Sequence, residues 1–155
     1  MATAAHDLRA TSARPDMTAA LMRETGLTDA CLRQFVEDFY AQVRCDPVLG
    51  PIFAARLTEW EPHLARMTDF WSSVALMTGR YHGRPMEAHA QLPVDWSHFE
   101  RWLTLFRQTA TESFAPDGAA HLIARAERIA RSLHIAVEDS RASAAPRLRP
   151  TDRGA

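Results

Sequence analysis

Apolar residues recur every three or four positions along the middle of this chain, which is the spacing of one face of an α-helix. No segment alternates apolar and polar residues between turn signals, as a strand would. The pattern predicts an all-α domain with four long helices and several short ones. The four helical faces comprise Leu32, Phe35, Val36, Phe39 and Val43; His63, Met67, Phe70, Val74 and Met77; Phe99, Trp102, Leu103, Phe106, Ala110 and Phe114; and Leu122, Ala126, Ile129, Ala130, Leu133 and Val137.

Glycine, proline and capping residues mark where these helices are expected to begin and end. The segment 47–53, PVLGPIF, is broken by Gly and Pro and is expected to form a corner with a short turn. In the second long helix, Leu64, Trp71 and Ala75 widen the apolar surface, so this helix is expected to pack on two sides. The expected caps are Asp16 for a short helix over 17–25, Thr58 with Glu61 for the second long helix, and Ser97 with Glu100 for the third.

The stretch GRYHGRPMEAH, residues 79–89, interrupts the helical pattern. Gly79 is a good helix terminator, and Pro85 is well placed as the first residue of a short helix that ends before Leu92. His89 follows Met86 by three positions and is therefore expected on the buried side of this short helix. A histidine held on a short piece of helix is a candidate ligand, although an ordinary surface histidine would fit the same pattern.

Composition and charge narrow the function classes. The chain has 155 residues, of which 46% are hydrophobic and 24% charged, an ordinary mix for one globular domain. Its net charge of −1 argues against nucleic acid or an anionic membrane surface as a partner. The segments 1–15 and 141–155 have few large apolar residues and are expected to be disordered extensions of a domain over 16–140. Two cysteines, no secretory signal and no membrane-length apolar run predict a cytoplasmic protein, expected to be a monomer.

Four polar side chains fall on or beside apolar helix faces: Tyr40, His63, His89 and Trp102. Each alone has an ordinary structural explanation as a core or surface residue. The sequence contains no zinc, calcium, phosphate-loop or serine-hydrolase motif. A bare metal would need more donors than two histidines, whereas a large, flat, apolar cofactor needs one axial donor and an apolar slot. Haem fits that description.

Three segments, FVEDFYAQVRCDPVLGPIF, EWEPHLARMTDFWSSVALMTGRYHGRPMEAH and FERWLTLF, resemble the group III truncated haemoglobins. The resemblance covers about residues 28–137 and implies a globin-like, truncated two-over-two helical sandwich around haem b. The glycine pairs that mark other truncated globin groups are missing, which favours the third group.

The resemblance also assigns residues. It implies that His89 is the proximal ligand of the iron and that Tyr40, His63 and Trp102 form the distal side, with His63 as a gate. Phe53 is expected to pack on the haem, and the remaining cofactor-binding candidates are the apolar pocket residues Met67, Phe70 and Met86 and the propionate partners Arg66, Tyr81 and Arg84.

Two kinds of haem function remain open, together with one reading that involves no haem. A ferrous haem protein of this kind would bind O2, CO and NO for storage, delivery or sensing. The same haem with a reductase would detoxify NO, reduce nitrite or react with peroxide as an enzyme. In the third alternative the chain is a helical interaction module in which His89 and Tyr40 are only structural.

Overall fold

The computed structural model of the protein describes residues 12–145, and this part of the chain consists of helices and connecting loops without a strand. The helices are α1 (Pro15–Thr25), α2 (Asp29–Cys45), α3 (Leu49–Arg56), α4 (Trp60–Leu76), α5 (Pro85–Ala90), α6 (Trp96–Ser113) and α7 (Pro116–Ala144). The all-α class and the four long helices predicted from the periodicity are confirmed.

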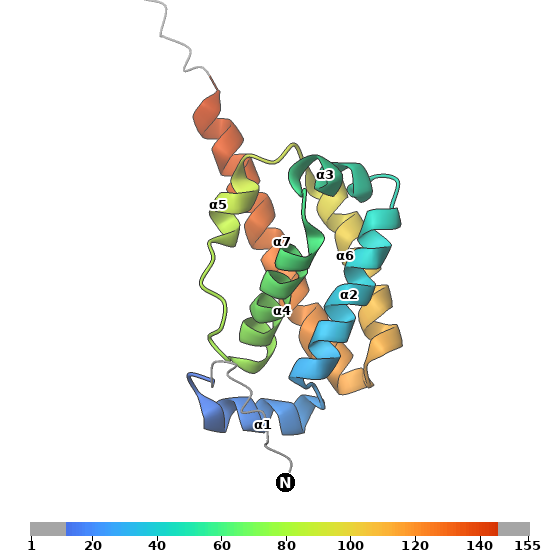
Figure 1. Ribbon diagram of the computed structural model, residues 1–155. Helices are drawn as coiled ribbons and strands as arrows, with labels where there is room; N and C mark the ends of the chain where they lie inside the picture. Colours follow the sequence, from blue (N-terminus) through green and yellow to red (C-terminus); the bar gives the residue numbers. More distant parts are fainter. Residues whose placement is uncertain (1–11, 146–155) are drawn as a thin grey trace, which may run out of the picture.

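The long helices form two packed pairs (Figure 1). Helices α2 and α4 lie against each other, α6 lies against α7, and α2 also packs on α6. Helix α1 crosses one end of this bundle against α4 and α7, while the short α5 lies against α7 towards the other end (Figure 1). This is the globin-like two-over-two arrangement that the family resemblance implied.

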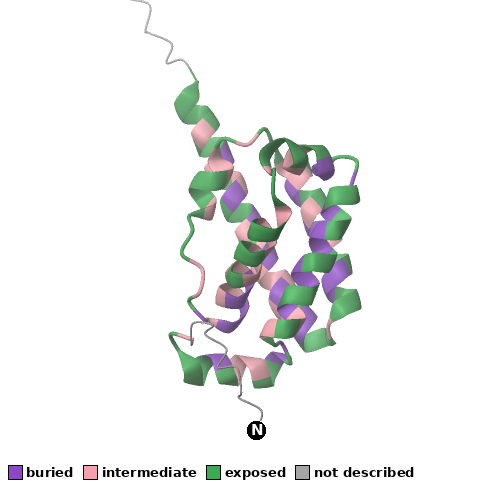
Figure 2. Ribbon diagram, viewed as in Figure 1, coloured by how far each residue is buried: buried purple, intermediate pink, exposed green. Residues whose placement is uncertain are grey.

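Large aromatic side chains fill the centre where these helices meet. Phe35 and Phe39 of α2 lie 5.1 and 5.2 Å from the ring of Phe106 in α6, and Trp71 of α4 lies 4.9 Å from the same ring. All four side chains are essentially inaccessible to solvent. Burial of each contributes roughly 1.5–3 kcal/mol, so this cluster dominates the apolar core. The buried residues line the inner faces of the helices (Figure 2).

Several predicted helix starts differ from the structure. Pro15 takes the first position of α1, so Asp16 lies in its first turn and is not its cap. The predicted Thr58 capping box is wrong, because α4 begins at Trp60 after Glu59, with no side-chain cap. The third helical position is then Pro62, which has no N–H for a capping oxygen to accept from.

The start of α6 is capped by a different pair from the one predicted. Asp95 is the cap, and its carboxylate accepts from the backbone N–H of Ser97 at 2.9 Å. Nδ1 of His98 accepts in return from the backbone N–H of Asp95 at 3.0 Å. The cap, and with it the start of the helix, therefore lies two residues earlier than the predicted box of Ser97 and Glu100 required.

The corner predicted over 47–53 is a helix of eight residues, α3. Gly50 and Pro51 lie in its first turn, where a missing N–H costs nothing, so they do not break it. A Cβ atom on Gly50 would lie 2.7 Å from the carbonyl oxygen of Arg44, so glycine permits α2 and α3 to meet this closely.

The helical region extends past both predicted domain limits, since α1 begins at Pro15 and α7 continues to Ala144. The rest of the expected extensions, 1–11 and 146–155, lies outside the described residues. Helix α4 ends at Leu76, three residues before the predicted terminator Gly79. Met77, which follows the helix, adopts the left-handed conformation with a φ of 55°.

Candidate functional site

Helix α5 presents His89 with one ring nitrogen already engaged. Pro85 begins this helix, as predicted, and its carbonyl oxygen lies 2.7 Å from Nδ1 of His89. Because a carbonyl oxygen only accepts, Nδ1 carries the proton and Nε2 keeps its lone pair. Nε2 makes no hydrogen bond to any described residue. A histidine that ligates a metal usually has this arrangement, with its other N–H held by a carbonyl or a carboxylate.

The ring of His63, in the first turn of α4, lies among three aromatic rings from three helices. Its centroid is 5.2 Å from Tyr40 of α2, 6.3 Å from Phe53 of α3 and 5.7 Å from Trp60 of α4. The Tyr40 and Trp60 rings are nearly perpendicular to it, at 86° and 89°. These contacts confine the imidazole to a narrow range of positions.

Nε2 of His63 is buried and has no hydrogen-bond partner in the described part of the chain. Burial is the main cause that lowers the pKa of His63 to about 4, and Coulombic interactions with Arg66 and His89 contribute to the same shift. The side chain is therefore neutral at physiological pH. A buried polar atom without a partner costs free energy, and such atoms in native proteins call for a ligand or another explanation.

Tyr40 and Trp102 contribute polar groups from the neighbouring α2 and α6. Tyr40 is buried, and its burial raises the pKa of the phenol, so the side chain stays a neutral O–H donor. Neither the Tyr40 hydroxyl nor the Trp102 indole N–H bonds to a described residue. The two rings do not stack on each other, since Phe39 lies between them at 5.1 Å from Tyr40 and 5.4 Å from Trp102.

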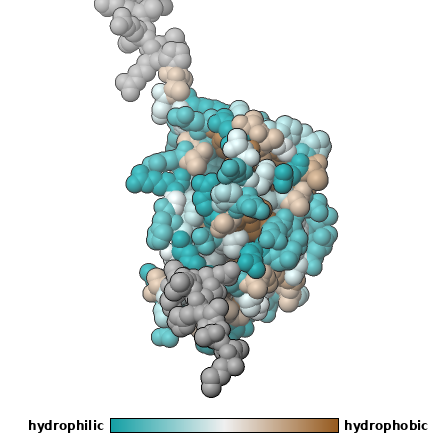
Figure 3. All heavy atoms as spheres, in the orientation of Figure 1, coloured by the Kyte–Doolittle hydropathy of each residue, from teal (hydrophilic) through white to brown (hydrophobic). Residues whose placement is uncertain are grey.

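The predicted apolar stripe of α4 is only half-buried. Met67, Phe70 and Val74 are partly exposed, whereas Trp71 and Ala75, expected only to widen the stripe, are fully buried. Helix α4 therefore packs its Trp71 side into the core and leaves an apolar face that no described helix covers completely. On the face of the molecule drawn in Figure 3, apolar side chains likewise reach the surface between polar ones.

The three predicted propionate partners lie in different settings. Arg66 is exposed, and its guanidinium makes no bond to a described residue. Arg84 is paired with Glu87 at 3.3 Å on the surface. Tyr81 packs edge-on against Phe70, with ring centroids 5.1 Å apart.

Met86 and Gly83 complete this edge of the site. Met86 is 42% exposed on α5. A Cβ atom on Gly83 would lie 2.1 Å from the Tyr81 hydroxyl, so a side chain at this position would displace the Tyr81 ring.

Trp60 and Arg44 are site residues that sequence reasoning missed. Trp60 stacks on Phe53 at 6.1 Å, and the Arg44 guanidinium lies 4.5 Å above the Trp60 ring. A cation in this position is held by the ring quadrupole. The only signal was the position of Trp60 in the segment EWEPH, three residues before His63. Their pairing across 16 residues follows from the meeting of α2 and α4 and has no local pattern.

Three other histidines have structural settings. His82 is exposed to solvent. His121 donates from Nε2 to the carbonyl oxygen of Ala75 at 2.8 Å. His134 lies 5.3 Å from the ring of Trp96, with a buried Nδ1 that has no partner among the described residues.

These features fit a flat, apolar cofactor with one axial donor. His89 offers an unengaged Nε2, α4 offers a half-buried apolar face, and His63 presents a buried nitrogen without a partner. Within residues 12–145, no group of three or more His, Cys, Asp and Glu residues lies together as a bare metal would require. An all-α two-over-two bundle with such a site is the arrangement of a globin.

Comparisons with known proteins support this class. Residues 21–135 match the model of the family described as bacterial-like globin. The group 3 truncated haemoglobin ctb of Campylobacter jejuni is 32% identical over 114 residues, which are 70% of this chain and 90% of that protein. The crystal structure of the group III truncated haemoglobin from Campylobacter jejuni superposes with a TM-score of 0.68 at 30% identity, covering 72% of this chain and 91% of the other.

The chain belongs to the bacterial-like globins and, within them, to the group III truncated haemoglobins. Membership of a globin family implies haem binding. In the described part of the protein, no helix is both long and apolar enough to traverse a bilayer.

Proposed function

We propose that the protein binds haem b through Nε2 of His89 and holds a small gaseous ligand beside Tyr40, Trp102 and His63. The observation that carries the proposal is the His89 geometry, in which Nδ1–H is tied to the Pro85 carbonyl at 2.7 Å and Nε2 is unengaged. This bond sets both the tautomer and the direction of the ring. Ferrous haem, when bound, would supply the iron chemistry that binds O2, CO or NO.

The distal residues would act on the ligand by hydrogen bonding. The Tyr40 hydroxyl stays protonated because the residue is buried, and the Trp102 indole N–H is a donor at every pH. Both are without a partner among the described residues, so each is available to a ligand that carries negative charge. Hydrogen bonds to a charged acceptor are shorter and stronger than neutral ones, especially in a dry pocket.

His63 has a different part in the proposal. Its ring is neutral and is confined by Tyr40 and Trp60, and its buried Nε2 lacks a partner. A neutral imidazole in this position can donate or accept one hydrogen bond, and its movement would open or close the distal side. Met67 and Phe70 would exclude water from the cofactor. Arg66 is the propionate partner that we favour, because its guanidinium has no other described bond, whereas Arg84 already pairs with Glu87.

A titration of the haem-free protein with haemin tests the cofactor assignment. We expect a Soret band that saturates at one haem per chain. In His89→Ala the affinity should fall at least tenfold, whereas His82→Ala should bind as the wild type does. His82 is a matched control, because it lies in the same segment but is exposed. Equal haem affinity for the wild type and both variants would overturn the assignment of His89.

A redox enzyme is the second candidate. The observation that favours it is the number of polar distal groups, since Tyr40, Trp102 and His63 would together hold oxygen tightly. Tight binding suits NO detoxification or peroxide chemistry better than oxygen delivery. Steady consumption of NO by the haem-loaded protein with O2 and a flavin reductase would support the enzyme. Fast oxygen release without turnover would support a carrier.

The cytoplasmic location and the monomeric state stay predictions.

A further inference from the structure

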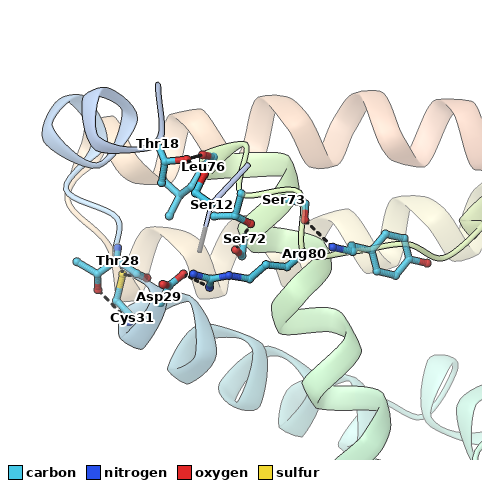
Figure 4. Close-up of polar contacts among 11 residues, drawn as sticks. Ser12, Thr18, Thr28, Asp29, Cys31, Ser72, Ser73, Leu76 and Arg80 are labelled. Carbon is cyan, nitrogen blue, oxygen red and sulfur yellow. Dashed lines mark hydrogen bonds and ion pairs between the residues drawn. The ribbon is translucent and has the colours of Figure 1, made fainter. Parts of the chain in front are cut away.

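The segment of residues 12–18, which we call the N-terminal clasp, contacts the end of α4 and the loop that leads to His89 (Figure 4). The Thr18 hydroxyl donates to the carbonyl oxygen of Leu76 at 2.7 Å in a buried position. Since that bond uses the single Thr18 proton, the Ser12 hydroxyl donates to Thr18 at 2.7 Å. The backbone N–H of Ala13 donates to the carbonyl oxygen of Thr78 at 3.1 Å.

These bonds satisfy carbonyl groups that a helix end leaves without partners. Leu76 is the last residue of α4, so its carbonyl has no acceptor role within the helix. The preceding carbonyl, of Ala75, accepts from His121 of α7, and that of Ser73 accepts from the N–H of Met77. An unsatisfied buried carbonyl is costly. The clasp therefore stabilises the conformation in which α4 stops and the chain turns.

The loop that follows is anchored at its beginning. The Thr78 and Ser72 hydroxyls lie 2.6 Å apart and are buried. Arg80 pairs with Asp29 of α2 at 2.9 Å, and the backbone N–H of Tyr81 donates to the Ser73 hydroxyl at 2.9 Å (Figure 4). Every one of these contacts lies within a few residues of the carbonyls that the clasp holds.

Beyond Tyr81 the segment has little packing of its own. Residues 82–84 are exposed, and no residue of α5 is buried. His89 is thus connected to the core from the N-terminal side through the short run from Thr78 to Arg84. Helix α5 lies against α7 but buries no residue, so the run from Thr78 to Arg84 is a route by which movement at Thr78 reaches α5.

We propose that the clasp is a positioning element for the His89 segment: through Thr18 and Ala13 it holds the start of the loop 77–84, and it thereby slows the loss of haem. The clasp precedes residue 21, where the family match begins, so it is outside the part shared with the family model. The predicted effect of the clasp on haem loss rests on the proposed function, whereas its predicted effect on the loop 77–84 does not.

Hydrogen–deuterium exchange on the full-length, haem-free protein tests the proposal. In Thr18→Val, which removes one buried hydroxyl and keeps the shape, we expect amides in 77–84 to exchange about fivefold faster or more. Ser12→Ala should produce a smaller increase in the same amides. With haem bound, the rate of haem transfer to an excess of apomyoglobin should rise several-fold in Thr18→Val.

Thr25→Val is the matched control. Thr25 lies on the same helix and, like Thr18, is 8% exposed, but its hydroxyl donates to Leu21 within α1 at 2.6 Å. The variant Thr25→Val should lower the melting temperature without a selective increase in the exchange rate of the amides in 77–84. Unchanged exchange there in both Thr18→Val and Ser12→Ala, or an equal increase in Thr25→Val, would overturn the proposal. Faster exchange in a protein that binds no haem would support the clasp as the anchor of the loop and refute the proposed function.

Discussion

The wall around Tyr40 and the segment around His89 are built in different ways. Tyr40, Phe53, Trp60 and His63 come from three helices and are held by ring contacts at 5.2–6.3 Å around a buried core. Helix α5 buries no residue, and the orientation of His89 depends on one hydrogen bond. Packing is non-directional and creates an apolar surface, whereas a hydrogen bond aims a single nitrogen atom. The two sides therefore respond to different kinds of substitution.

The largest expected effect is on the packed side. Phe39 is fully buried and contacts the rings of Tyr40, Trp102 and Phe106. Phe39→Ala should lower the free energy of unfolding of the haem-free protein by about 3–5 kcal/mol. Guanidinium unfolding followed by circular dichroism measures it, with Met86→Ala in the exposed α5 as the control, expected within about 0.5 kcal/mol of the wild type. Equal losses for the two variants would contradict the comparison.

Asp46 should have the next largest effect, because it connects two elements of the packed side. Its side chain is 6% exposed and accepts from the N–H groups of Val48 and Leu49 at the start of α3. The single Nε–H of Arg101 in α6 is shared between the two carboxylate oxygens, and Nε lies 2.7 Å from each. Asp46→Ala should cost about 2 kcal/mol, and Asp95→Ala, which removes an exposed cap, should cost less. A reversed order in denaturant midpoints would show that Asp46 does not hold α3 in place.

Arg101 also sets a pH dependence for Asp46. Its guanidinium is the main cause that holds the pKa of the Asp46 carboxyl below its usual value of 3.8. The folded state then binds this proton less readily than the unfolded state. The contribution of the Asp46 carboxylate to the free energy of unfolding is therefore complete above pH 3.8 and is lost as the pH falls below that value.

Tyr40→Phe should change ligand binding more than stability. Removing the hydroxyl leaves the ring contacts with Phe53 and His63 in place and takes away one donor. If the hydroxyl stabilises bound oxygen, the oxygen dissociation rate should rise about tenfold. Stopped-flow displacement of oxygen by carbon monoxide measures this rate. An unchanged rate would remove Tyr40 from the distal site, even if Trp102→Phe still accelerates release.

A smaller effect is expected from pH in the range where histidines titrate. Burial is the main cause that lowers the pKa of His63 to about 4 and that also lowers the pKa of His121 from 6.5. On acidification these histidines take up protons in the unfolded state before they do so in the folded state. Their contribution to the free energy of unfolding is therefore complete above about pH 6.5 and is lost as the pH falls towards 4. We expect a loss of about 1 kcal/mol between pH 7 and 5 in the haem-free protein.

The variant His63→Leu provides the control for this pH dependence. This variant should show a smaller decrease in the free energy of unfolding between pH 7 and 5, since leucine does not titrate. The variant His82→Leu should show the same decrease as the wild type, because His82 is exposed. Denaturant midpoints at pH 7, 6 and 5 measure both variants. The same slope in His63→Leu and the wild type would show that burial does not keep His63 neutral.

The sequence predicted the long helices because their apolar periodicity is strong, and it predicted α5 because Pro85 fits a first helical position. The sequence pattern singled out Tyr40, His63, His89 and Trp102 as polar residues on or beside apolar faces, but their proximal and distal roles came only from a family resemblance. It could not predict the caps at Glu59 and Asp95, since several nearby residues compete for each. The Thr18–Leu76 bond spans 58 residues, so no local pattern reveals it.

The most direct test of the account is the absorption spectrum of the reduced, haem-loaded protein before and after addition of carbon monoxide. It should be recorded for the wild type and for His89→Gly, each with and without free imidazole. We predict a strong Soret band in the wild type that shifts and sharpens with carbon monoxide. In the variant this band should be weakened or altered, and imidazole should restore it by replacing the missing side chain. A variant spectrum identical to that of the wild type without imidazole would contradict the assignment of His89 as the ligand of haem.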